Sequence, residues 1–570
     1  MIMKNIIIVI SLFFFNVTTS QCLSSTIWDG AGWSNGLPTS TINAIISSNY
    51  DTGNEGSIDC CGITVNSGSI LIINISDYCN VYGNITVDSG SSLIVRSGAS
   101  LIPVNNNCIS TGIVSIERRT PTTKRFDYTY WSSPVNTTVG NALLSTKWEP
   151  NQTFTFNTSS FYDVETSYWG NFISNVPDGQ DDDGNAWVRT LISDTMIPGK
   201  GYASMIKSIP PVGSYPRTEL VTFTGELNTG DISIPLSLSQ NVAEINDDFN
   251  IVGNPYSSSI NSDDVIDSNI DSITGTLYFW THSNTMTTTY SGLAQYNFST
   301  NDYAKYTKLG GITAVFGGKK PSNVIGSCQG FVVEAEGTGT QLSFSPYMMS
   351  KAYVNSTSVS FFRNDNRGND RESTLWLNMS NGSDLFSQQL IGYNRSTNKN
   401  YNKGWDSKIT TPRQVLKFYS IENNINYDIQ ARGKFRNDDK VKIGYFSAID
   451  SEYTISIDTK EGDMVNRDVY LYDKSFGIWH DLSEPYSFST IAGTFNDRFF
   501  IKYKNPENDD DDRDDKNEIK TESRIEVYDM FGRHIKTIDG YEFSDLPKGQ
   551  ILILKIYRSG IIETKKYFGI

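Results

Sequence analysis

Two neighbouring segments of the chain are almost the same: residues 63–73 read ITVNSGSILII and residues 85–95 read ITVDSGSSLIV. They start 22 positions apart, and a third, partial copy, SGASLIP, follows at 97–103. Each copy has a strand pattern, an Asn/Asp-Ser-Gly turn and a second strand pattern. Because one such coil cannot bury its apolar face alone, the coils are expected to stack as a short β-helix that another part of the chain must cap. The alternative is a chance repeat within a β-sandwich.

Cysteine is concentrated around this repeat. Of the six cysteines in the chain, all but Cys328 fall in the first 108 residues: Cys22, Cys60, Cys61, Cys79 and Cys108. Clustered cysteines are typical of small units stapled by disulfides in an oxidising compartment. We therefore expect a unit at 21–115 with one or two disulfides, whose pairing the sequence leaves open. Cys328 is expected to be a buried small side chain.

Short strand patterns fill the chain beyond this unit. Stretches such as FDYTYWSSPV (126–135) and GTLYFWTH (275–282) alternate apolar and polar residues, which is typical of antiparallel sandwiches. A second set of strands begins near residue 350 and predicts two β-sandwich-like regions, at 116–348 and 349–504. Helical periodicity is almost absent, with one short helical turn expected near 263–269. The predicted fold class is all-β.

Composition restricts the function classes. The 570-residue chain carries 47 Lys and Arg against 63 Asp and Glu, a net charge of −16. Because phosphate binding needs a positive field, we expect no nucleic-acid partner. The sequence has no HExxH motif, phosphate-binding loop or dinucleotide fingerprint, and no CxxC metal spacing. These patterns favour a protein that is not an enzyme and has no cofactor.

The first twenty residues have the pattern of a signal peptide. Lys4 supplies a positive charge, Ile6–Phe15 form an apolar core, and Thr18-Thr19-Ser20 offers small residues before a cleavage site. The apolar core is too short to span a bilayer, and no later stretch is long and apolar enough for a membrane helix. We expect Sec-dependent export and removal of residues 1–20, with no transmembrane helix afterwards.

One acidic loop is the best candidate for a metal site. The segment PDGQDDDGNAW (177–187) places Asp181, Asp182 and Asp183 before a glycine, as calcium loops do. The EF-hand pattern fails, because two of its acidic ligand positions hold other residue types. An exposed acidic loop without a metal is the favoured interpretation, and calcium binding is the alternative.

Aromatic residues alternate along several of the strands. An alternating aromatic face usually forms the core of a sandwich, and this is the favoured interpretation. The alternative is a platform on which sugar rings stack. Exposure distinguishes the two, and the residues to compare are Trp131, Trp169, Trp187 and Trp280.

An acidic run separates the last fifty residues from the rest. Residues 505–518 read NPENDDDDRDDKNE, with seven acidic residues against one arginine in 507–515. Such a run cannot bury apolar surface and its charges repel one another, so 505–520 is expected to be an extended linker. A calcium cluster is the alternative. The tail at 521–570 returns to strand patterns.

The tail contains VYDMFGR (527–533), GQILILK (549–555) and a closing Lys-Lys pair. In these stretches it resembles the C-terminal sorting domains of the type IX secretion system of Bacteroidetes, in a shorter variant that lacks the Tyr-Pro-Asn-Pro opening. The matching residues are Tyr528, Asp529, Gly532, Arg533, Gly549, Lys555, Lys565 and Lys566. The resemblance implies a small β-sandwich domain and passage through the outer-membrane translocon. It also implies removal of the domain, with the protein then released or attached to surface polysaccharide.

Stretches along the rest of the chain include TIWDGAGWSNGLPT (26–39), IVGNPYSSSI (251–260) and GTFNDRFFIKY (493–503). They resemble a layout that recurs among large exported flavobacterial proteins. That layout offers no catalytic residues to transfer, so it implies a location and a non-enzymatic character.

Together these patterns predict an extracellular or outer-surface, non-catalytic, multi-domain β protein that acts in adhesion, matrix or glycan contact. Its expected partners are the Sec and type IX machineries and a surface polysaccharide or extracellular glycan. Two alternatives stay open. One is a secreted carbohydrate-active enzyme or its carbohydrate-binding module, and the other is a structural surface-layer component.

Overall fold

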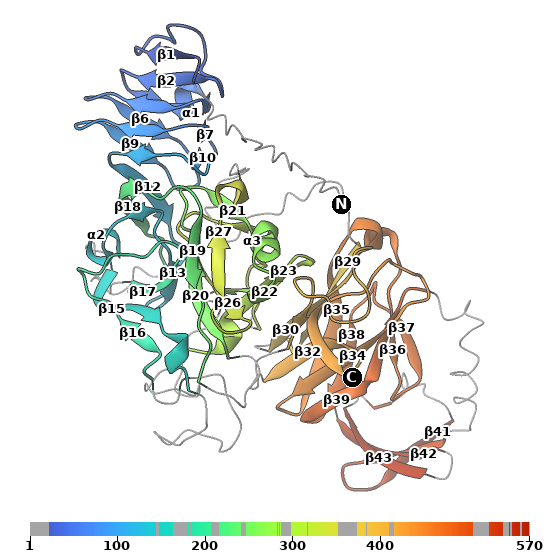
Figure 1. Ribbon diagram of the computed structural model, residues 1–570. Coiled ribbons are helices and arrows are strands. Elements are labelled where there is room, and N and C mark those ends of the chain that lie inside the picture. Colours follow the sequence, from blue (N-terminus) through green and yellow to red (C-terminus); the bar gives the residue numbers. More distant parts are fainter. Residues whose placement is uncertain are drawn as a thin grey trace, which may run out of the picture.

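The computed structural model consists mostly of β-strands, which confirms the all-β class. Figure 1 shows a β-helical unit at the N-terminal end, a central region of several sheets, a second sandwich and a small C-terminal sheet. Within the described ranges, none of the helices has the length and apolarity that a bilayer crossing requires. The structure describes residues 22–143, 148–162, 181, 184–206, 216–240, 247–281, 283, 286, 298–315, 317–350, 373–382, 385–409, 415–504, 524–539, 546–547, 550–558 and 561–568.

The repeat forms a β-solenoid with three parallel sheets, one for each side of the coil (Figure 1). In the two central coils, each strand pairs with the strand 22 positions later: Ile63 with Ile85, Leu71 with Leu93, and Cys79 with Leu101. These side chains are buried and stack along the inside of the coil. The solenoid contains β1 (Ser24–Trp28), β2 (Ile42–Ile46), β3 (Tyr50–Asp51), α1 (Thr52–Glu55), β4 (Ile58–Cys60), β5 (Ile63–Val65), β6 (Ile70–Ile73), β7 (Tyr78–Val81), β8 (Ile85–Val87), β9 (Ser92–Val95), β10 (Ser100–Pro103), β11 (Ser110–Thr111) and β12 (Val114–Arg119).

The partial copy SGASLIP forms the third side of a coil rather than a further coil. Its strand, β10, pairs with β7 in a separate sheet. The next coil is made by β11 and β12, whose sequences have lost the repeat. Ser-Gly recurs because the corners of the coil need a positive φ that glycine adopts without strain, as it does at Gly68, Gly90 and Gly98.

Both ends of the solenoid are covered. At the first end the rings of Trp28, Trp33 and Tyr50 form a cluster with centroid distances of 5.7, 5.0 and 5.5 Å. At the other end β18 (Leu220–Leu227) pairs antiparallel with β12, and β14 (Val135–Asn136) pairs antiparallel with β18. An antiparallel strand ends the stack of parallel strands, so the region that follows the solenoid in sequence caps the solenoid. The predicted boundary between 115 and 116 consequently lies within β12.

The central region has two facing sheets with a further core behind one of them. A four-stranded sheet, β13-β17-β15-β16, faces a five-stranded sheet, β20-β26-β22-β23-β24, across a layer of aromatic side chains. In that layer Tyr130 stacks on Trp280 and its hydroxyl lies 2.7 Å from that of Tyr303. The other face of the five-stranded sheet packs against α3, β19 and β27.

The short helix expected near 263–269 is confirmed as α3 (Ser262–Ser268), whose first turn is capped by the side chain of Asn261. The remaining elements of the region are β13 (Tyr128–Trp131), α2 (Val139–Leu143), β15 (Trp148–Phe156), η1 (Thr158–Ser160), β16 (Trp187–Arg189), β17 (Tyr202–Ile206), β19 (Ile232–Pro235), β20 (Phe249–Gly253), β21 (Ser259–Asn261), β22 (Ile273–Trp280), η2 (Thr300–Asp302), β23 (Tyr303–Thr307), β24 (Gly310–Ile312), β25 (Val324–Ile325), β26 (Gly330–Ala335), β27 (Gln341–Phe344), η3 (Pro346–Met348) and β28 (Met349–Ser350).

The second sandwich is one long sheet that curls back on itself. Its strand order is β37-β36-β39-β34-β32-β33-β30-β29-β35-β38, with β31 also paired to β33. Only residues 482–485 connect the two edge strands, β37 and β38, so these edges are close together and the sheet encloses a core. The elements are β29 (Ser373–Ser380), β30 (Phe386–Tyr393), β31 (Ser407–Lys408), β32 (Leu416–Glu422), β33 (Ile425–Ala431), β34 (Lys440–Ser447), β35 (Ser451–Glu461), η4 (Gly462–Asn466), β36 (Tyr470–Asp473), β37 (Ile478–Asp481), β38 (Tyr486–Thr490) and β39 (Gly493–Lys502).

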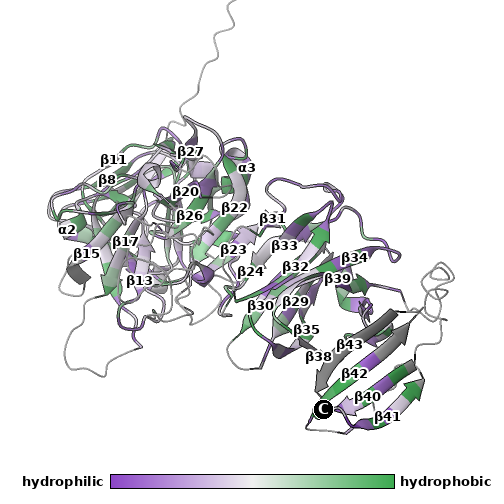
Figure 2. Ribbon diagram, turned by 90° about the horizontal axis from the view of Figure 1, so that it is seen from below, coloured by the Kyte–Doolittle hydropathy of each residue, from purple (hydrophilic) through white to green (hydrophobic). Residues whose placement is uncertain are grey.

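The central region and the second sandwich share a packed interface. β24 lies beside β30 (Figure 2), and Leu309 and Ile312 join a buried cluster that includes Trp376. The indole N–H of Trp376 donates to the carbonyl of Gly311 at 2.8 Å. A buried ion pair between Lys305 and Asp428 also crosses the interface.

The tail forms a four-stranded antiparallel sheet in the order β41-β40-β42-β43. Its buried residues include Ile525 and Val527 of β40 and Leu552 and Leu554 of β42. The described residues of the tail thus form a single sheet, and the small sandwich expected for the tail stays a prediction. The strands are β40 (Arg524–Asp529), β41 (His534–Asp539), β42 (Ile551–Arg558) and β43 (Ile561–Phe568).

Candidate contact face and the other predicted sites

Four strands of the second sandwich present a face rich in aromatic and lysine side chains. These strands lie in the order β37-β36-β39-β34 at one end of the long sheet. Side chains alternate between the two faces of a strand, and Val441, Leu471 and Ile501 belong to the buried core. Their neighbours along each strand therefore point to the outer face.

The strand register arranges these outward residues in two rows, which we call the aromatic–lysine face. From β34 to β37, the first row is Lys442, Phe500, Tyr472 and Trp479. The second row is Lys440, Lys502, Tyr470 and Asp481. Aromatic rings fill most of one row, and two lysines lie directly beside them in the other.

Within this face the rings stack and lysines lie over them. The rings of Tyr472 and Trp479 have centroids 4.7 Å apart and an interplanar angle of 28°. The ammonium group of Lys502 lies 5.1 Å from the centroid of Trp479, and that of Lys440 lies 4.4 Å from the centroid of Phe500. Because a cation is attracted to the face of an aromatic ring, these contacts hold the lysines in defined positions.

Positive charge exceeds negative charge among the described residues of this face. Lys442 and Lys474 share the carboxylate of Asp497, at 3.4 and 2.9 Å. The hydrogen bond from Lys474 lowers the pKa of the Asp497 carboxyl below its usual value. The two rows themselves hold three lysines (Lys440, Lys442 and Lys502) and one aspartate (Asp481), in a chain whose net charge is −16.

Such a face suits a ligand that combines apolar ring faces with carboxylate groups. Trp479, Phe500 and Lys440 are half-buried, so part of each side chain is accessible, whereas Tyr472 and Lys502 are buried. Aromatic side chains present a large apolar area with a defined geometry, while ammonium groups form charge-assisted hydrogen bonds with carboxylates. Acidic polysaccharides provide both features.

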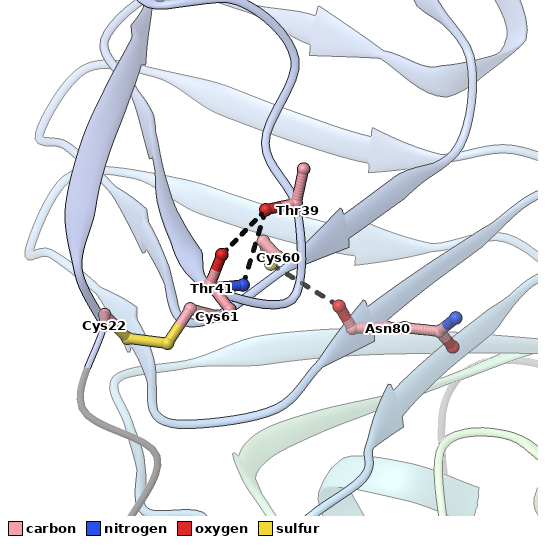
Figure 3. The surroundings of a disulfide bond; sticks show 6 residues. All are labelled: Cys22, Thr39, Thr41, Cys60, Cys61 and Asn80. Carbon is pink, nitrogen blue, oxygen red and sulfur yellow. Dashed lines mark hydrogen bonds between the residues drawn. A yellow bond between two sulfur atoms is a disulfide. The ribbon is translucent and has the colours of Figure 1, made fainter.

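The five N-terminal cysteines, for which one or two disulfides were expected, form one disulfide. Cys22, just before β1, is bonded to Cys61, at the corner between β4 and β5, with Cα atoms 5.6 Å apart (Figure 3). Cys60, Cys79 and Cys108 are buried free thiols. Burial raises the pKa of the Cys108 thiol to about 11. The disulfide ties the first strand to the coil that follows, and Cys328 is buried as expected.

The acidic loop has a structural role at its one described aspartate. The carboxylate of Asp181 accepts hydrogen bonds from the backbone N–H groups of Tyr162 and Ala186, at 3.1 and 2.8 Å. Asp182 and Asp183 lie outside the described residues. In the part of the chain that the structure describes, no group of three or more His, Cys, Asp or Glu side chains could hold a metal ion.

The tryptophans chosen for comparison differ in exposure. Trp131 is fully buried and Trp280 is half-buried, in line with a core role. Trp187 is 38% exposed at the end of the four-stranded sheet. Trp169 lies outside the described residues. The tryptophan of the aromatic–lysine face is Trp479, which is not one of the four tryptophans named from the sequence.

The predicted sorting residues lie on a hairpin and two long strands. Tyr528 and Asp529 end β40, and Gly532 has a positive φ in the turn before Arg533. The Asp529 carboxylate accepts hydrogen bonds from the backbone N–H groups of Phe531 and Arg533, both at 2.9 Å, and from the Arg533 guanidinium at 2.6 Å.

These contacts fix the turn, and the backbone hydrogen bond from Arg533 is the main reason why the pKa of the Asp529 carboxyl is lowered. Lys555 lies on β42, and Lys565 and Lys566 lie on β43 opposite Leu554 and Ile553. Gly549 is outside the described residues.

Comparison with known protein families matches residues 20–503 to DUF8693, a domain of unknown function. The matched span contains the solenoid, the central region and the second sandwich, and it stops before the acidic run. No curated protein and no solved structure matches the chain. Because the match extends over most of the 570 residues, the chain belongs to the DUF8693 family.

Proposed function

We propose that the protein is a non-catalytic, multi-domain β protein of the cell surface or extracellular space that contacts an acidic glycan. The observation that carries this proposal is the aromatic–lysine face, in which the half-buried Lys440 lies over Phe500, in the row next to that of the half-buried Trp479. A ligand with sugar rings and carboxylates would gain stacking and charge-assisted hydrogen bonds at one surface.

Binding to polysaccharides tests the proposal. The purified chain, applied to an array of acidic and neutral polysaccharides, is expected to bind the acidic ones and to lose binding as salt is raised. Trp479→Ala and Lys440→Gln are each expected to weaken binding by about tenfold, since each removes a stacking or cation contact. Lys319→Gln, at an exposed lysine on the central region, is the matched control and should bind as the unchanged chain does.

Equal binding of acidic and neutral polysaccharides would contradict the proposed ligand class. Unchanged affinity in both face variants would contradict the proposed location. Shortening of a polysaccharide during incubation would support the alternative of a carbohydrate-active enzyme. Absence of binding across the array would favour the structural surface-layer alternative.

Export is proposed to use the Sec and type IX secretion machineries. Support comes from the signal-peptide pattern at 1–20, from the resemblance of the tail at 521–570, and from the Cys22–Cys61 disulfide, since disulfides persist in oxidising compartments. Deleting residues 521–570 is expected to leave the protein in the periplasm. Fractionation with intact-mass analysis would show both expected cleavages, and a truncated protein that still reached the surface or medium would contradict the proposal.

A further inference from the structure

Within the residues that the structure describes, β16 is paired on one side only, and several of its neighbours are exposed apolar residues. It ends the four-stranded sheet, whose order is β13-β17-β15-β16. Trp187 and Val188 within it are 38% and 45% exposed, and Leu191 and Ile192 just beyond it are 65% and 63% exposed. Soluble proteins usually protect such edges with charge, proline or a covering element, because an open edge is a template for another strand.

The hydrogen bonds to β15 show which backbone groups point to the open side. Asn157 donates to Ala186, and Thr190 donates to Thr153, on the inner side of β16. Hydrogen-bonded and non-hydrogen-bonded pairs alternate along an antiparallel ladder. The N–H and C=O groups of Trp187 and Arg189, the residues between, therefore point away from β15.

The side chains of those two residues share one face of the strand. Trp187 packs against Phe156 with ring centroids 5.1 Å apart. Arg189 lies over the ring of Phe154, with its guanidinium carbon 5.9 Å from the centroid. An aromatic residue and a cation thus stand two positions apart on the same face of an open edge.

We propose that β16 is a homodimer interface, at which two copies pair antiparallel about a two-fold axis through Val188. In this register Trp187 of one copy is opposite Arg189 of the other, and the reverse pair forms as well. These are the residues whose backbone groups face outward, so each opposed pair exchanges both of its hydrogen bonds. The two four-stranded sheets become one sheet of eight strands (4 + 4).

Self-complementarity favours a second copy over an unrelated strand. A two-fold interface uses the same patch on both subunits, and here that patch supplies both partners of two Trp–Arg contacts. The guanidinium of one copy extends the aromatic row of Phe156 and Trp187 in the other. The exposed apolar residues Leu191 and Ile192 follow the strand closely in each copy, and they offer further apolar area to a strand of only three residues.

Sedimentation velocity of the purified full chain over a range of concentrations tests this proposal. We expect a dimer that dissociates on dilution. Arg189→Pro removes the outward N–H and leaves the bonds of Ala186, Val188 and Thr190 to β15 in place, so it should abolish the dimer. Arg189→Glu should raise the dissociation constant by about tenfold or more, because two cation–π contacts are lost per dimer.

Two further variants make the result specific. Arg189→Lys keeps a cation over the opposing ring and should stay within about threefold of the unchanged chain. Ile491→Arg changes another exposed apolar residue, on the second sandwich, and should not alter the dissociation constant. Circular dichroism confirms that each variant is folded. A chain that is monomeric at all concentrations, or a folded Arg189→Glu variant that dimerises normally, would overturn the proposal.

Discussion

At the scale of single residues, one strongly perturbed ionisable group of the central region is Glu334 on β26. Its side chain belongs to the layer between the two facing sheets and is only 5% exposed as a residue. Thr274 Oγ1 donates to its carboxylate at 3.3 Å. Burial raises the pKa of Glu334 to about 7, even though the hydrogen bond from Thr274 opposes the rise.

This pKa predicts a loss of stability toward alkaline pH. A carboxyl whose pKa is higher in the folded state binds its proton more tightly there, so its contribution is present below the unfolded pKa and lost as pH rises through about 7. Glu334→Gln removes the charge at every pH. From pH 5 to pH 8, the free energy of unfolding measured in urea should fall by roughly 2–3 kcal/mol more in the unchanged chain than in the variant. Parallel pH profiles for both proteins would contradict the assignment.

At the scale of elements, the sequence predicts the solenoid strands whose residue types repeat. It does not predict the strands that share only their buried positions. Strands β5, β6, β8 and β9 repeat at 22 positions with the same alternation, so their stacking follows from the sequence. The stacking on the third side of the coil does not follow from the sequence, because YCNV in β7 and SLIP in β10 share buried positions but no residue types.

The aromatic–lysine face was missed for a related reason. Alternation within YLYD of β36 and within FFIK of β39 is visible in the sequence. Which strands lie side by side is decided by the closure of the whole sheet, and this is a long-range property. The rows that join Lys442 to Trp479 across four strands appear only when the strand order is known.

The disulfide gives a prediction at this scale. Cys22→Ser opens a covalent loop with a sequence separation of 39, which should destabilise the first coils by about 4 kcal/mol through the larger entropy of the unfolded chain. Hydrogen exchange read by mass spectrometry should show earlier exchange in β1 and β2. Reducing the unchanged chain should reproduce this effect, and reductant should have no further effect on the variant. Full protection of β1 in the reduced protein would contradict the predicted stabilisation of the first coils by the disulfide.

At the scale of the whole molecule, the central region and the second sandwich are joined more tightly than two domains on a flexible linker. Leu309 is completely buried in their shared cluster, and an added Cβ at Gly392 would lie 2.4 Å from its side chain. Trp376, Lys305 and Lys320 each make a direct contact across the interface. These two parts are therefore expected to unfold together.

Leu309→Asp tests this coupling. The substitution removes buried packing and places a carboxylate in an apolar cluster, at a cost of roughly 3–5 kcal/mol. Calorimetry should show one main transition for these two parts in the unchanged chain and two separate transitions in the variant. Val465→Asp, at an exposed residue of the second sandwich, should leave the profile unchanged. Identical profiles for both variants would contradict the coupling.

The antiparallel seam between β12 and β18 also fixes an order of events when the chain emerges from a pore or a ribosome. β18 begins roughly 100 residues after β12 ends. The outer edge of β12 therefore stays unpaired until the chain has emerged as far as residue 227. An emerging chain stopped before residue 220 should expose that edge to protease, and one stopped after residue 240 should protect it. Partial chains are thus most vulnerable in this window, and a chaperone for an exposed strand would be needed during it.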